Sequence, residues 1–147
     1  MPYDFDQDIY DGDPETRQAT NDLVNDFRDQ GKFVTAICNG VTALSTMRDH
    51  DGNSLLEGRT VSAFSEFIPR ANGQWYTSRS LVESNGATHV PSGSVGDPTT
   101  RTDDVIVDGM IITAENWNAA CRFGEVIAEQ LYLQAVDEAF TNNDMFE

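Results

Sequence analysis

The 147-residue sequence predicts a single α/β domain. Three observations lead to this fold class. Apolar, strand-like runs alternate with helix-like segments, the length suits one domain with its own core, and a strand-like run passes directly into a small-residue helix at Cys38. A continuous apolar strand of this kind is typical of a parallel sheet that is covered by helices on both faces.

The N-terminal elements are a loop and a helix. Residues 1–12 have no hydrophobic periodicity and many aspartates, so we expect a loop. A helix is predicted over about 14–30, because Asp13 can cap it, Pro14 suits its first position and Gly31 suits its end. Its apolar face consists of Ala19, Leu23, Val24 and Phe27.

The middle of the chain alternates short strands and helices. Residues 33–37 are an apolar run typical of a strand that is buried on both faces, and the small residues of 40–47 predict a helix. Residues 49–53 predict a turn, 59–64 a strand, and 75–84 a helix.

The C-terminal part begins with a long loop at 93–104. Residues 105–113 predict a β-hairpin around Asp108-Gly109, because this dipeptide between two apolar runs is a strong hairpin signal. A long helix over 116–140 ends the predicted fold.

Charge and composition exclude several classes of function. The 25 acidic and 9 basic residues give a net charge of -16, which disfavours nucleic-acid and anionic-membrane partners. The acids form either an ordinary solvated surface or an adaptation to high salt, in which case stability rises with salt. No apolar run is long enough to span a membrane, and no secretory signal or disulfide framework is visible, so we expect a cytoplasmic protein.

The segment "FVTAICNGVTAL", residues 33–44, carries the main functional signal. A buried strand that turns tightly into a helix is a nucleophile elbow, which lifts one side chain above the sheet. Cys38 is the candidate nucleophile; the helix that follows favours its thiolate, and the backbone N–H of Asn39 can face an oxyanion. The alternative is that Cys38 is a small buried hydrophobic residue.

Four segments resemble, in order, parts of the PfpI/ThiJ superfamily, which is related to the type 1 glutamine amidotransferases: "GKFVTAICNGVTAL", "LLEGRTVSAFSE", "LVESNGA" and "DDVIVDGMIITAENWNAACRFGEVIAEQL". The resemblance covers residues 13–147 and implies a flavodoxin-like, doubly wound, largely parallel sheet with a hairpin near the C-terminus. It places the reactive cysteine of the family at Cys38.

The function that this resemblance implies is cysteine-dependent chemistry on a small carbonyl or acyl substrate, of the glyoxalase III, deglycase or hydrolase type. The alternative is a non-catalytic member that senses oxidants through Cys38 or binds a metabolite or a protein. The sequence shows neither a metal-ligand spacing nor a phosphate-binding loop, so we expect no metal and no cofactor.

The sequence also departs from the family. Ahead of Cys38 the family has a first βαβ unit, an acidic residue that hydrogen-bonds the cysteine, and a Gly-Gly turn, none of which matches this chain. The strand at 33–37 therefore needs another cover: a longer native chain, a separate subunit, or a second copy in a homo-oligomer.

The histidine base of the family is also missing. Asn39 stands where many members have a histidine, and Phe64 or Ser65 where others have one. His50 is interpreted as a surface residue of a turn. His89 could approach the site from the end of a neighbouring strand, but it is interpreted as a structural histidine. Cys121 is interpreted as a core residue of the last helix.

Overall fold

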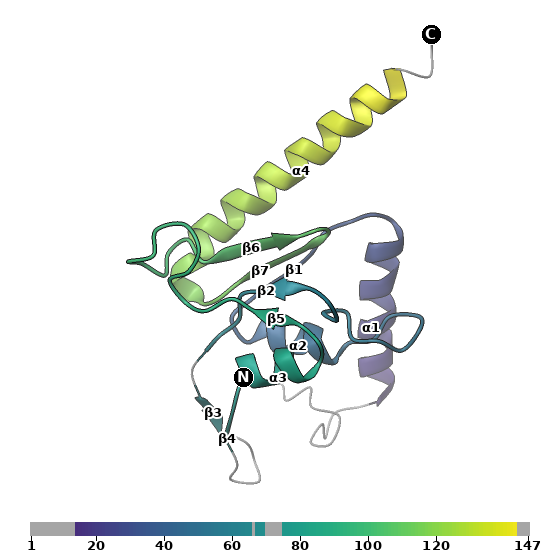
Figure 1. The fold of residues 1–147 in the computed structure, drawn as a ribbon. Coiled ribbons are helices and arrows are strands. Elements are labelled where there is room, and N and C mark those ends of the chain that lie inside the picture. The colour runs from purple at the N-terminus through teal and green to yellow at the C-terminus, as the bar shows by residue number, and fades with distance from the viewer. Residues whose placement is uncertain (1–13, 66, 70–74, 144–147) are drawn as a thin grey trace.

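The computed structural model describes residues 14–65, 67–69 and 75–143, and its elements are labelled in Figure 1. It has a mixed α/β fold, as the sequence predicts. The main sheet has three strands in the order β1-β7-β6, formed by Val34–Ile37, Ile111–Ala114 and Val105–Asp108. β1 and β7 are parallel, whereas β7 and β6 form an antiparallel hairpin.

Two further strand pairs complete the described strands. The parallel pair consists of β2 (Thr60–Val61) and β5 (Thr88–His89), and the antiparallel pair of β3 (Phe67–Pro69) and β4 (Trp75–Thr77). This last pair is not anticipated by the sequence.

β2 runs in the same direction as β7. The backbone N–H of Thr60 donates to Asp108 Oδ2 at 2.7 Å, near the turn of the hairpin, and that of Ser62 donates to Thr113 Oγ1 at 3.0 Å, further along β7. β1, β7, β2 and β5 therefore all run in one direction, and their carboxyl ends lie at one edge. In open α/β sheets this is the edge where binding sites form.

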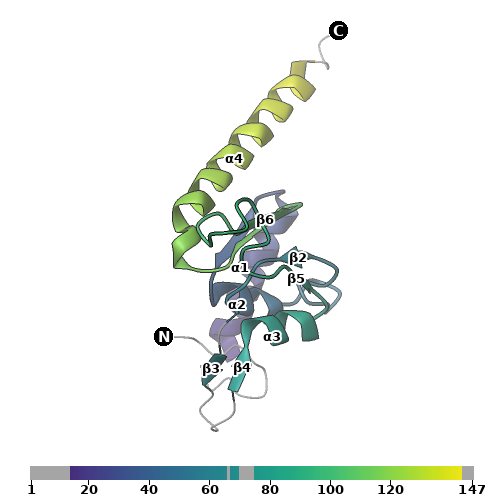
Figure 2. The same ribbon diagram turned by 60° about the vertical axis from the view of Figure 1, so that its left-hand side comes forward.

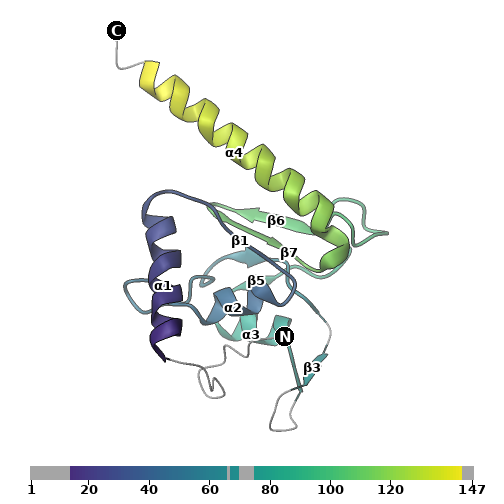
Figure 3. The ribbon, with the colours of Figure 1, turned by 180° about the vertical axis from the view of Figure 1, so that it is seen from behind.

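The helices surround this framework unevenly. They are α1 (Pro14–Asp29), α2 (Gly40–Thr46), α3 (Ser78–Ser84) and α4 (Ala120–Asn143), with a 3₁₀ turn at Trp117–Ala119. Figure 2 shows α2 and α3 together near β2 and β5. Figure 3 shows the molecule from behind. In this view α4 extends far above the main sheet, whereas α1 lies below it.

The core consists of two apolar clusters, which pack because they remove apolar surface from water. The larger one joins β1, α2, β2 and α3, and its most buried members are Val41, Leu56, Val61, Ala63 and Val82. The smaller one packs the start of α4 against the hairpin. Its buried members are Val105, Ile112, Ala114, Ala119 and Val126.

Two predicted strands differ from the structure. The run 33–37 is not buried on both faces: within β1 only Val34 is buried and Thr35 is exposed. In addition, no described strand pairs with the outer edge of β1. Of the predicted strand 59–64, only Thr60–Val61 pairs in a ladder. The expected loop at 1–12 and the cap Asp13 lie outside the described residues.

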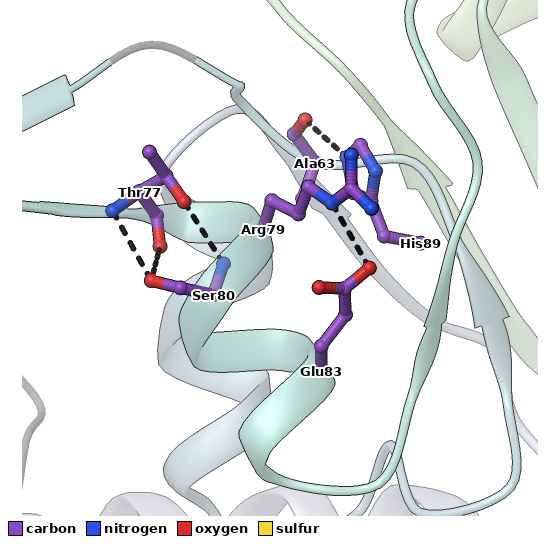
Figure 4. Close-up of polar contacts among 6 residues, drawn as sticks. All are labelled: Ala63, Thr77, Arg79, Ser80, Glu83 and His89. Atoms are coloured by element: carbon purple, nitrogen blue, oxygen red, sulfur yellow. Dashed lines mark hydrogen bonds and ion pairs between the residues drawn. The ribbon is translucent and has the colours of Figure 1, made fainter.

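The predicted helix 75–84 begins three residues later than expected. Trp75–Thr77 is the strand β4, and α3 starts at Ser78. The reason is a capping box, shown in Figure 4: Thr77 Oγ1 accepts from the N–H of Ser80, and Ser80 Oγ accepts from the N–H of Thr77. This reciprocal pair stabilises a helix start at 78 and leaves the residues before it extended.

The hairpin is where the sequence places it, but its turn is shifted by one residue. Asp108 pairs with Ile111, so the two-residue loop is Gly109-Met110 rather than Asp108-Gly109. Gly109 has a φ of 58°, which glycine adopts without steric cost. Asp108 instead closes the last pair of the ladder and binds the neighbouring strand β2.

Candidate functional site

Cys38 lies at a sharp turn between β1 and α2. Its φ is 61°, and it is the only non-glycine residue with a positive φ in the described part of the chain. Its N–H donates to Ala114 O at 2.9 Å, which continues the ladder between β1 and β7, and its carbonyl already accepts from the N–H of Val41 at 3.2 Å. One residue thus ends the strand and starts the turn, which is the backbone geometry of an elbow.

This geometry has an energetic cost. A left-handed conformation costs a residue with a Cβ atom about 1–2 kcal/mol relative to the right-handed one. Such strain persists only where the surrounding structure enforces it, and it is concentrated at functional sites. The Cys38 side chain is half-buried and forms no disulfide, so its thiol stands at the partly exposed edge of the sheet.

Asn39 follows in a helical conformation, with φ -64° and ψ -19°, as the N-cap of α2. Its side chain does not cap the helix. Its Oδ1 instead accepts a long hydrogen bond, 3.4 Å, from the hydroxyl of Ser78, the fully buried first residue of α3. This contact ties the elbow to the start of the neighbouring helix.

Glu115 is a site residue that the sequence interpretation missed. It directly follows β7, and its side chain is 1% exposed. Ser65 Oγ donates to Glu115 Oε1 at 3.0 Å, whereas Oε2 is buried with no hydrogen-bond partner among the described residues. The available signal was an acidic residue immediately after the apolar run "IITA", where a parallel strand ends.

His89 is buried, as a structural histidine is expected to be. Its Nε2 lies 3.1 Å from Ala63 O, as Figure 4 shows, and its Nδ1 is buried without a partner among the described residues. β5 pairs with β2, and within the described residues neither of these strands pairs with β1 or β7. The topology places Glu115 directly after the strand that pairs with that of Cys38, and His89 in a different strand pair.

Two other sequence interpretations have clear outcomes. His50 is exposed, and its Nε2 lies 2.9 Å from Asp29 Oδ2; this hydrogen bond, together with the charge of Asp29, raises the pKa of His50. The interpretation of Cys121 as a core residue is wrong, because it lies exposed on the first turn of α4. The side chains of that helix which face the hairpin are its neighbours, including Phe123 and Val126.

A groove lies at the opposite edge of the sheet. It has a volume of about 690 Å³ and is lined by Phe33, by Gly109-Met110 and by residues of α4 that include Leu133. Phe33 precedes β1 and Met110 precedes β7, so the groove lies at the amino ends of these strands. It is therefore separate from the elbow, which lies at the carboxyl ends of the same strands.

Neither metal binding nor membrane spanning finds support in the described ranges. Within 14–65, 67–69 and 75–143, no group of three or more His, Cys, Asp or Glu side chains is placed to hold a metal ion. In the same ranges, none of the helices combines the length and the apolar character that crossing a membrane requires.

Comparisons with known proteins give a fold and no family. No family model matches the chain, and no curated protein matches it. Solved structures do. A protein designated APC35852 superposes with a TM-score of 0.65 at 22% identity, over 90% of this chain and 55% of its own. The Rapid Encystment Protein of 24 kDa from Francisella tularensis gives 0.64 at 21% identity, over 88% of this chain and 53% of its own.

Glyoxalase III from Candida albicans is also similar, with a TM-score of 0.59 and 21% identity, over 76% of this chain and 48% of its own. At these identities the likeness shows a shared fold, and that fold is consistent with the PfpI/ThiJ-like fold to which the sequence motifs point. The chain spans about half the length of these structures.

Proposed function

We propose that this chain carries the nucleophile half of a PfpI/ThiJ-type enzyme, in which Cys38 attacks a small carbonyl or acyl substrate. The observation that carries the proposal is the positive φ of Cys38, 61°, at the carboxyl end of a parallel strand. The fold that the chain shares with a glyoxalase III supports it. Completed by further strands beside β1, the sheet would be the doubly wound, flavodoxin-like one that the sequence motifs imply.

The chemical step uses groups at the elbow. The Cys38 thiolate forms a bond to the electrophilic carbon, and the electron pair of the C=O bond moves onto the oxygen. The N–H of Asn39 follows the nucleophile directly, and it donates to no carbonyl in the described residues. It is therefore available to donate to the oxyanion, which is how an elbow stabilises this charge.

A second candidate function is oxidant sensing through Cys38, without turnover. The observation that favours it is the position of His89, which lies in a different strand pair from that of Cys38 and has its Nε2 against Ala63 O. A reactive thiol without an imidazole base can still be oxidised by peroxide to a sulfenic or sulfinic acid. The two candidates predict different behaviour of the same residue, so one set of variants tests both.

The test compares three proteins: the native chain, Cys121→Ser, and Cys38→Ser with Cys121→Ser. Because Cys121 is exposed, alkylating reagents can label it as well as Cys38. It is therefore replaced, so that the labelling measured is that of Cys38. In Cys121→Ser we expect iodoacetamide to label Cys38 with an apparent pKa below about 8.5, the value of a free thiol. We also expect turnover of methylglyoxal, measured as D-lactate, that disappears in the double variant.

The outcomes separate the candidates. Labelling and peroxide sensitivity without turnover of methylglyoxal, of glycated peptides or of small esters would favour the sensor. A Cys38 that is unreactive in the folded protein would contradict both.

A further inference from the structure

One carboxyl group at the sheet edge is buried without being fully satisfied. Among the described residues, only one oxygen of Glu115 has a partner, the hydroxyl of Ser65. Leaving a buried polar atom unpaired costs about 1–3 kcal/mol, so a native chain retains one only for a reason. Asp104 provides the contrast: it is also fully buried, but its Oδ1 and Oδ2 accept from the N–H groups of Val95 and Gly93. Asp104 thus uses both oxygens to hold a loop, whereas Glu115 keeps one oxygen that can accept a hydrogen bond or a proton.

The register brings this acceptor next to the elbow. Ile37 and Ala114 are the last paired residues of β1 and β7, and Cys38 N–H donates to Ala114 O at 2.9 Å. Cys38 and Glu115 are thus the next residues on two adjacent parallel strands, whose backbones lie about 4.8 Å apart. Both leave the sheet at the same edge. In the described part of the chain, Glu115 is the acidic residue that directly follows the strand paired with that of Cys38.

From this juxtaposition we infer that Glu115 is the proton acceptor for Cys38, an inference that rests on the cysteine chemistry proposed above. The thiol S–H bond breaks, its proton passes to Glu115 Oε2, and its electron pair forms the bond from sulfur to the carbonyl carbon. The displaced C=O pair becomes the oxyanion, which faces Asn39 N–H. The oxyanion then takes the proton back from Glu115. Atoms and charge balance without any further reactant. Ser65 holds the other oxygen and so fixes the orientation of the carboxyl group.

The experiment measures how fast iodoacetamide alkylates Cys38 as a function of pH, with Cys121→Ser as the parent protein. A thiol and a carboxyl that share one proton titrate as a pair, so the parent profile should rise in two steps. Glu115→Gln keeps the size of the side chain and an oxygen that can accept from Ser65, but it cannot take a proton. We expect its profile to have a single step.

Turnover gives the second measurement. Loss of a general base costs about 100-fold or more in rate, so Glu115→Gln should lose methylglyoxal turnover by at least that factor while Glu115→Asp retains part of it. The matched control is Glu83→Gln, which removes an exposed carboxylate of α3 that is paired with Arg79. Its profile and its turnover should equal those of the parent. Thermal unfolding of every variant checks that the fold is retained.

The possible results are distinct. A two-step profile that persists in Glu115→Gln, or unchanged turnover, would overturn the role of Glu115 and leave Cys38 as the nucleophile. A Cys38 that fails to react in the parent itself would overturn the proposed function, and this inference with it. If Glu115→Gln fails to fold, two other variants test the inference. Glu115→Asp retains a carboxyl group at a shorter reach, and Ser65→Ala retains Glu115 but removes its hydrogen-bond donor. Unchanged alkylation profiles in both would count against the inference.

Discussion

At the scale of single residues, the backbone of Cys38 can be tested separately from its thiol. Cys38→Ala keeps a Cβ atom in the left-handed conformation, whereas Cys38→Gly removes it. We therefore expect Cys38→Gly to be more stable than Cys38→Ala by about 1 kcal/mol, measured by urea unfolding, although neither variant has a thiol. Equal stabilities, or a less stable glycine variant, would show that the elbow stores no strain.

The glycine at position 40 offers a matched control for this comparison. Gly40 has a negative φ, and a Cβ atom added there would meet only the Cβ of Ala36, at 3.8 Å. Gly40→Ala should therefore be tolerated. A stabilising effect of glycine at 38, together with tolerance of alanine at 40, would locate the strain at the nucleophile itself.

Cys38 could be found from the sequence because its signal is local: a strand, one residue and a helix adjoin within a short stretch. Glu115 could not, because its proximity to Cys38 depends on which strands pair and in which register, and "TAEN" has no pattern of its own. The same holds for His89, because the sequence does not show that its strand β5 pairs with β2 and not with β1. Chemistry assembled from distant segments requires the topology.

At the scale of elements, Asp108 joins the hairpin to β2. Its Oδ2 accepts from the N–H of Thr60 at 2.7 Å, and Arg59 lies 3.1 Å from its Oδ1. The hydrogen bond from Thr60, with a smaller contribution from Arg59, lowers the pKa of the Asp108 carboxyl below its usual value of 3.8. The charged carboxylate thus helps to hold β2 parallel to β7.

The pH dependence of this contact follows from the sign of the shift. A carboxyl whose pKa is lower in the folded state contributes stability above its unfolded pKa, and this contribution is lost as the pH falls through the folded value. We expect Asp108→Asn to lower the free energy of unfolding by about 1 kcal/mol at neutral pH, since hydrogen bonds to a charged group at a partly exposed site are modest. The difference from the native chain should shrink below about pH 4.

Denaturant unfolding at a series of pH values measures this difference. Asp51→Asn is the control, because Asp51 is an exposed aspartate of the turn at 49–53. A loss of stability in Asp108→Asn that is the same at neutral and acidic pH would mean that the charge does not matter and that only packing was changed.

Elements with strong local signals could be predicted from the sequence, and the others depend on tertiary context. α1 begins at Pro14 and α2 at Gly40 as expected, because proline and small residues fix these positions. The start of α3 was misplaced, since Trp75 and Tyr76 fit a helix until the capping box of Thr77 is seen. Cys121 was misjudged because apolar residues occur around the whole of α4, so its buried face cannot be read from periodicity.

At the scale of the whole molecule, apolar surface is concentrated around β1. A groove of about 260 Å³ runs between α1 and β1 and is lined by Leu23, Val24, Phe27, Phe33, Val34 and Thr35. Leu23 is 57% exposed, and β1 has no described strand on its outer edge. On α4, Leu131, Tyr132, Leu133 and Phe140 are also exposed. Surfaces of this kind in folded proteins are normally covered by a partner.

We expect this surface to be covered by further strands, either from a second copy or from a segment of the kind that makes up the other half of the similar structures. The measurement is the mass of the purified 147-residue chain by light scattering. Association of two copies has to overcome a net charge of -16 on each, so it should strengthen from low salt to molar potassium chloride as screening increases. Phe27→Asp, within the groove, should weaken it, whereas Glu83→Gln, on the exposed face of α3, should not. A chain that stays monomeric at every salt concentration, melts cooperatively and turns over substrate at about 1 to 1000 per second would show that β1 needs no cover.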